Sequence, residues 1–126
     1  MSQGRLVILC VDDEPNALIL RKLVLQRAGY EVITASSGKQ ALEMAGSQAI
    51  DLLLSDQLMP GMTGTQLARE IRVRLPNARI VLISGVNEIP PDADVADIFL
   101  SKVEGPEALC KTVASALLPK EPKGEQ

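Results

Sequence analysis

Short apolar runs alternate with amphipathic stretches along the whole chain, and this alternation predicts its secondary structure. Runs rich in Val, Ile and Leu, bounded by turn residues, are typical of β-strands. The first and fourth runs are apolar at almost every position, which predicts strands buried on both faces of a sheet. The five predicted strands are Arg5–Val11, Glu31–Ala35, Leu52–Ser55, Arg79–Ser84 and Ile98–Ser101.

Between these strands, apolar residues recur at helical spacing. The predicted helices run from Pro15 to a stop at Gly29, over Lys39–Ala45 with Ser36 or Ser37 as N-cap, over Thr63–Arg74, and from Pro106 through Leu117. The first helix is expected to bury one apolar face made of Ala17, Leu20, Leu23 and Val24.

Five strands alternating with helices predict a parallel sheet with helices on both faces, because right-handed crossovers leave few other topologies. The expected class is therefore a doubly wound α/β fold. The segment Val86–Ala96 is an exception to the alternation, since Pro90 and Pro91 interrupt any regular helix there. We expect the fourth helix to be shortened or irregular.

Composition narrows the function further. The chain has 126 residues, of which 46% are hydrophobic and 23% are charged, and this length and composition are typical of one globular domain. A net charge of -3 argues against a direct nucleic-acid partner, which requires clustered basic residues. The apolar runs are too short to span a membrane and no leader is evident, so a cytoplasmic location is expected. Cys10 and Cys110 are expected to be buried thiols in a reducing compartment.

Histidine is absent from the sequence, which excludes catalytic arrangements that depend on it. The remaining polar candidates follow the predicted strands at their carboxyl ends, where doubly wound sheets bind ligands. These candidates are Asp12 and Asp13 after the first strand, Asp56 after the third, Ser84 closing the fourth, and Lys102 after the fifth. By contrast, Asp51 and Asp97 precede their strands and are expected at the opposite edge as surface caps.

Three carboxylates in one pocket repel each other by about 4 kcal/mol per close pair at an effective dielectric of 20, so a cation is expected among them. Oxygen ligands that leave room for water and phosphate favour Mg²⁺, and Mn²⁺ is expected to substitute. Together with a nearby hydroxyl and ammonium group, the carboxylates and the cation are the groups that phosphoryl transfer requires. In that interpretation Asp56 is the nucleophile, Asp12 and Asp13 hold the metal, and Ser84 and Lys102 contact the phosphoryl oxygens.

The segments V-D-D-E-P (11–15) and S-D-Q-L-M-P-G-M-T-G (55–64) resemble the two signature segments of response regulator receiver domains. The resemblance covers residues 5–118. It suggests a receiver domain over residues 1–118, followed by a polar tail or the start of a linker at 119–126. It implies a flavodoxin-like sheet of order 2-1-3-4-5 and phosphorylation of Asp56.

The same resemblance implies a metal site and a switch. Mg²⁺ would be held by Asp13, Asp56 and the backbone carbonyl of Leu58, with Asp12 acting mostly through water. Ser84 would turn toward the phosphoryl group while Phe99 moves inward, although core filling is an equally good explanation of Phe99.

Two departures from the family pattern concern signal output. Lys102 is followed by Val103 where proline is usual, and a trans peptide bond is expected there because a cis bond without proline costs about 2.5–4 kcal/mol. The Val86–Ala96 segment is also short. Leu58 and Val86 flank the pocket with apolar side chains, which predicts a long-lived phosphorylated form.

The resemblance implies a histidine kinase or phosphotransfer protein as external phosphoryl donor, and a downstream protein partner that the sequence does not identify. Two other functions stay open. One is a constitutive docking domain with a vestigial acidic pocket. The other is a phosphatase similar to the haloacid dehalogenases, which use a second Asp two residues after the first, where this chain has Leu58.

Overall fold

The structure is a computed structural model that describes residues 4–85, 95–102 and 104–118. Its centre is a five-stranded parallel sheet in the order β2-β1-β3-β4-β5, as predicted. The strands are β1 (Val7–Val11), β2 (Glu31–Ala35), β3 (Leu52–Asp56), β4 (Arg79–Ser84) and β5 (Ile98–Ser101). The helices in the described part of the chain are α1 (Pro15–Arg27), α2 (Gly38–Ala45), α3 (Gly64–Arg74) and α4 (Pro106–Leu117).

The helices begin where the local sequence provides a start signal. Pro15 and Pro106 occupy the first turns of α1 and α4, where a missing N–H costs nothing. Ser37 caps α2, because its side chain accepts a hydrogen bond from the Gln40 backbone N–H. At the start of α3, Thr63 and Gln66 satisfy each other's backbone N–H groups in a capping box.

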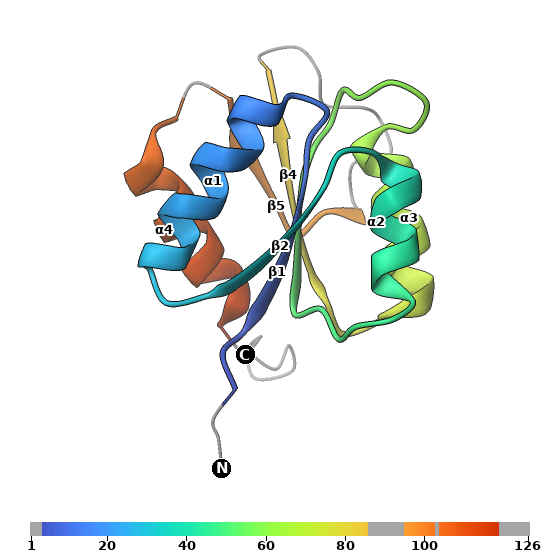
Figure 1. Ribbon diagram of the computed structural model, residues 1–126, viewed down its shortest axis with the longest axis horizontal. Coiled ribbons are helices and arrows are strands. Elements are labelled where there is room, and N and C mark those ends of the chain that lie inside the picture. The colour runs from blue at the N-terminus through green and yellow to red at the C-terminus, as the bar shows by residue number, and fades with distance from the viewer. Residues whose placement is uncertain (1–3, 86–94, 103, 119–126) are drawn as a thin grey trace, which may run out of the picture.

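Helices cover both faces of the sheet, with α1 and α4 on one side and α2 and α3 on the other (Figure 1). Successive strand residues alternate between the two faces, so β1 contributes Leu9 and Val11 to one core and Ile8 and Cys10 to the other. This explains why the central strands are apolar at nearly every position. Because all five strands are parallel, their carboxyl ends share one edge of the sheet.

The buried face of α1 agrees only in part with the prediction. Val24 packs against the core as expected. Leu20 and Leu23 are 58% and 54% exposed, whereas Leu25 is fully buried and Leu18 packs against the same core. This helix carries apolar residues on several of its faces, so helical spacing alone does not determine which face is buried. The packing of α1 against β2 and α4 selects it, and Ile19, Leu20 and Leu23 are left as an exposed apolar face, here called the α1 apolar face.

Asp51 and Asp97 lie at the amino edge of the sheet, as the sequence predicts. The Asp51 carboxylate accepts a hydrogen bond from the Val7 N–H at 2.7 Å. The Asp97 carboxylate accepts one from the Ile80 N–H at 2.7 Å and lies 3.4 Å from a guanidinium nitrogen of Arg72. These two acids therefore satisfy strand ends away from the phosphoryl-transfer candidates.

Several expectations fall on residues 86–94, 103 and 119–126, which lie outside the described residues. They concern Val86, Pro90, Pro91, the bond to Val103 and the polar tail. Within the described residues, no α-helix separates β4 from β5. None of the described helices is long and apolar enough to cross a membrane.

The two cysteines are free, but only one is buried. Cys10 lies inside β1, and burial raises the pKa of its thiol to about 12. Cys110 is only half-buried, because the face of α4 that packs on the sheet is formed by Leu109 and Val113 instead. The expectation of a second buried thiol is therefore wrong.

Candidate functional site

Strand register brings the sequence-predicted polar residues to one edge of the sheet. Val11 pairs with Ser55, so Asp12, the residue after β1, and Asp56, the last residue of β3, lie at the ends of neighbouring strands. On the other side, Ser84 pairs with Ser101 at the ends of β4 and β5. The site is therefore assembled from four strand ends that are far apart in sequence.

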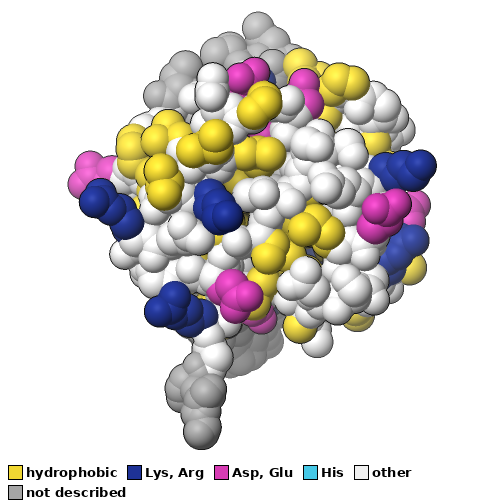
Figure 2. Space-filling model, viewed as in Figure 1, with side chains coloured by type: hydrophobic (Ala, Val, Ile, Leu, Met, Phe, Trp, Pro, Cys, Tyr) yellow, Lys and Arg dark blue, Asp and Glu magenta, His cyan; other side chains and the backbone are white. Residues whose placement is uncertain are grey.

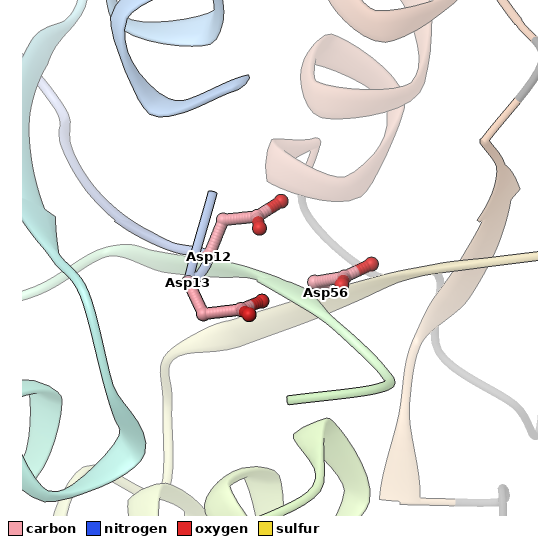
Figure 3. A group of neighbouring side chains, drawn as sticks. All are labelled: Asp12, Asp13 and Asp56. Carbon is pink, nitrogen blue, oxygen red and sulfur yellow. The ribbon is translucent and has the colours of Figure 1, made fainter. Parts of the chain in front are cut away.

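Asp12, Asp13 and Asp56 form a cluster, here called the acidic pocket. Each offers a carboxylate oxygen, and these oxygens lie within 4.8 Å of one another. Figure 3 shows the three carboxylates extending in the same direction from the ends of the strands. Asp12 and Asp56 are buried, whereas Asp13 is exposed and leaves the pocket open to solvent.

Asp56 is the least satisfied member of this pocket. Its Oδ1 atom is buried and has no hydrogen-bond partner among the described residues. Lys102 Nζ lies 3.3 Å from Oδ1, an ion-pair distance without hydrogen-bond alignment. Burial and the negative charge of Asp12 raise the pKa of Asp56, while Lys102 and Arg21 oppose that rise. The ionised carboxylate is therefore destabilised electrostatically, and a cation or electrophile that enters the pocket would stabilise it.

Lys102 is positioned by the backbone. Its N–H donates a hydrogen bond to the Ser84 carbonyl at 2.9 Å, which continues the β4–β5 ladder by one residue. The side chain is 40% exposed and reaches back to Asp56, while Ser84 is buried at the end of β4. Three carboxylates and the Lys102 ammonium are thus gathered at this edge of the sheet, where β4 also ends in the hydroxyl-bearing Ser84.

These residues fit a hard divalent cation. Carboxylate oxygens are the ligands that Mg²⁺ and Mn²⁺ prefer, and Asp56 Oδ1, which has no hydrogen-bond partner among the described residues, is suited to coordinate such an ion. The small number of protein oxygens leaves room for water and an anionic oxygen, as Mg²⁺ requires. Asp12, Asp13 and Asp56 could therefore hold Mg²⁺.

The two remaining candidates are Leu58 and Phe99. Leu58 follows Asp56 by two residues, and its side chain is 51% exposed. Phe99 sits on β5 opposite Leu82, half-buried against the core on the α2 and α3 side. The structure thus leaves the Leu58 side chain exposed and Phe99 in the sheet.

Arg21 belongs to the site, although sequence reasoning did not select it. Its guanidinium pairs with the Asp12 carboxylate at 2.5 Å from the middle of α1. The available signal was the spacing of Leu18, Arg21 and Leu25, which places a cation within the stripe that the sheet buries. That signal was masked because α1 is apolar on other faces too.

The sequence also did not predict a set of buried hydrogen bonds between Gln57, the residue after Asp56, and the start of α3. The Gln57 side-chain oxygen accepts hydrogen bonds from Thr65 N–H at 3.0 Å and from the Thr65 hydroxyl at 2.9 Å. The Gly64 N–H donates to the Gln57 carbonyl at 2.9 Å. These bonds tie the residue after Asp56 to the start of α3. Gln57 lies inside the D-Q-L-M-P-G segment, but its partner is set only by the turn that follows.

Comparison with known proteins gives a consistent result. The family described as response regulator receiver domain matches residues 8–114. The transcriptional regulatory protein GlrR of Escherichia coli is 35% identical over 122 residues, covering 93% of this chain and 27% of that protein. The sensor kinase CckA of Brucella abortus is 34% identical over 122 residues, covering 90% of this chain and 13% of that protein.

A solved structure agrees in fold. The response regulator protein TrrA of Thermotoga maritima, in complex with Mg²⁺ and beryllofluoride, is 37% identical and superposes with a TM-score of 0.82. The match covers 90% of this chain and 99% of that one. The match thus spans nearly all of that solved chain, but only about a quarter of the curated regulator named above.

Proposed function

This chain belongs to the response regulator receiver domain family, and from that premise we propose that it is a Mg²⁺-dependent signalling switch that accepts a phosphoryl group on Asp56. The observation that carries this proposal is the buried Oδ1 atom of Asp56, which has no hydrogen-bond partner among the described residues and lies beside two further carboxylates, 3.3 Å from Lys102 Nζ. As a member of this family the chain is a phosphoacceptor, which argues against the phosphatase alternative.

Each side chain of the site has a role in this proposal. Asp56 is the nucleophile, and Asp12, Asp13 and the Leu58 carbonyl, together with Asp56, hold the metal. When bound, Mg²⁺ neutralises the charge on the transferred oxygens. Lys102 and Ser84 would donate hydrogen bonds to those same oxygens. Phe99 follows Ser84 inward when the group is attached.

The reaction is an in-line transfer from a phosphorylated imidazole. A carboxylate oxygen of Asp56 attacks phosphorus and forms an O–P bond, while the P–N bond of the donor breaks. The electron pair of that bond returns to the imidazole nitrogen, which takes up a proton. No histidine is present in these 126 residues, so the phosphorylated imidazole belongs to a histidine kinase or phosphotransfer domain outside them.

Incubation with acetyl phosphate tests the proposal. We expect Mg²⁺ or Mn²⁺ to be required for the gain of one phosphoryl group by intact mass, and a metal chelator to abolish it. Borohydride reduction of the acyl phosphate followed by peptide mapping should locate the group on Asp56. Absence of label in the presence of Mg²⁺, or undiminished label in the chelator, contradicts the proposal. Equal binding of a downstream partner with and without beryllofluoride would instead favour a constitutive docking domain.

The α1 apolar face is suited to contact a protein donor. Ile19, Leu20 and Leu23 are more than half exposed, and Leu20 also lines a groove with Lys102 and Pro106. Figure 2 shows hydrophobic side chains gathered over this part of the molecule, at the left of the view. A protein that docks here would bring its phosphohistidine over the acidic pocket. The position of this face beside the pocket supports a protein donor.

Substitution of the α1 apolar face should separate protein donors from small ones. We expect Ile19→Glu to lower the rate of phosphotransfer from a cognate kinase by about tenfold or more, because an apolar contact is replaced by a charge. The rate with acetyl phosphate should stay within about twofold. The matched control is Val73→Glu on α3, a residue that is 79% exposed and away from the pocket. An equal loss with both donors would contradict the docking role.

A further inference from the structure

Arg21 reaches the acidic pocket from α1 and engages one of its carboxylates. Its Nη1 atom lies 2.5 Å from Asp12 Oδ2. The other oxygen of Asp12, Oδ1, accepts a hydrogen bond from the Glu14 N–H at 2.9 Å. Both oxygens of Asp12 therefore have partners, and the carboxylate is held in one orientation.

This ion pair differs from the surface pairs that contribute little to a protein. The Arg21 and Asp12 side chains are 17% and 5% exposed, whereas the pair of Arg74 with Glu70 on α3 is about half exposed. A buried carboxylate needs a partner, and loss of that partner has a large effect. Arg21 is thus the standing counter-ion of Asp12.

Charge counting shows what this counter-ion does to the pocket. Three carboxylates against Arg21 and Lys102 leave one net negative charge in the empty pocket. Mg²⁺ alone would make the pocket positive, and an aspartyl phosphate, with a charge of about −2, would return it to neutrality. Without Arg21, Mg²⁺ alone would already neutralise the pocket, and the phosphorylated state would be left negative.

We propose that Arg21 is a positioning residue that makes Mg²⁺ binding depend on the phosphoryl group. It weakens Mg²⁺ binding to the pocket that lacks a phosphoryl group, and it stabilises the phosphorylated pocket that holds Mg²⁺. It acts through Asp12, whose Oδ2 atom it occupies and whose charge it offsets. The inference rests on the proposed function, because it assumes that Mg²⁺ and a phosphoryl group meet at Asp56.

Calorimetric titration of Mg²⁺, with and without beryllofluoride, measures this coupling directly. We expect Arg21→Met to bind Mg²⁺ about tenfold more tightly than the natural chain in the absence of beryllofluoride, because repulsion between the guanidinium and the metal is removed. The factor by which beryllofluoride tightens Mg²⁺ binding should fall by about tenfold. By thermodynamic linkage, Mg²⁺ should strengthen beryllofluoride binding less in this variant, by the same factor.

Two further variants distinguish charge from shape. Arg21→Lys keeps the cation and should stay within about threefold of the natural chain in both titrations. Arg27→Met removes the same charge from an exposed position at the end of α1 and should change neither dissociation constant by more than about twofold. If Arg21→Met lacks a native circular dichroism spectrum, Arg21→Gln carries the same expectation.

The outcomes separate this inference from the proposed function. Unchanged or weaker Mg²⁺ binding in Arg21→Met, with normal binding in the natural chain, overturns the role of Arg21 and leaves the switch intact. An equal effect in Arg27→Met also overturns it. Failure of the natural chain to bind Mg²⁺ and beryllofluoride overturns the proposed function and this inference with it.

Discussion

Replacing Asp56 by asparagine is expected to abolish phosphorylation from acetyl phosphate and from any protein donor. An amide oxygen is a far weaker nucleophile than a carboxylate, and it carries no charge to bind the metal. Intact mass spectrometry should show no added phosphoryl group, and calorimetry should show no beryllofluoride binding. Label that survives in Asp56→Asn would mean that another residue is the acceptor.

The same substitution should make the protein more stable in a metal-free buffer at neutral pH. Burial and the charge of Asp12 raise the pKa of Asp56, so its ionised form opposes folding. We expect Asp56→Asn to raise the free energy of unfolding by on the order of 1 kcal/mol, since close carboxylates repel by a few kcal/mol and Lys102 offsets part of this. Urea denaturation followed by circular dichroism measures the difference.

The pH dependence of that gain provides a control. A raised pKa in the folded state means that acidification stabilises the natural chain relative to Asp56→Asn. The advantage of the variant should be complete above the raised pKa of Asp56 and should disappear as the pH falls below its ordinary value of 3.8. Mg²⁺ should stabilise the natural chain more than the variant. An advantage that is constant with pH would contradict this account.

Gly64→Ala is expected to damage both the fold and the site. A Cβ atom at this position would lie 2.6 Å from the Asp56 carbonyl oxygen and 3.0 Å from the Gln57 Cα. Both contacts are with backbone that cannot move without shifting Asp56. We expect the free energy of unfolding to fall by about 2–3 kcal/mol. The rate of phosphorylation should fall by at least about tenfold, because small displacements of a reacting group are costly.

Gly46→Ala is the matched control for this change. Gly46 follows α2 with a φ of -76°, and an added Cβ would meet only ordinary contacts at 3.5 Å and beyond. The free energy of unfolding should therefore change by less than about 0.5 kcal/mol. Equal stabilities for Gly64→Ala and the natural chain would show that the backbone near Asp56 tolerates a shift.

The sequence alone was sufficient for the order of the elements and for most of the site. Strand periodicity and turn residues are local properties, so β1 to β5 and the four helices begin and end close to where they were predicted. In a parallel sheet every strand points the same way. The position of Asp12, Asp13, Asp56 and Lys102 after their strands therefore placed them at one edge before any contact was known.

The contacts between distant elements were decided only by the tertiary structure. Helix α1 carries apolar residues on several of its faces, so its packing on the sheet decided that Leu25 is buried while Leu20 and Leu23 stay exposed. The same rotation of the helix directed Arg21 to Asp12. Helical spacing sets which residues share a face, but the energy of packing against β2 and α4 sets which face is buried. The carboxylates at the sheet edge were thus predictable from the sequence, whereas their arginine counter-ion depended on how α1 packs.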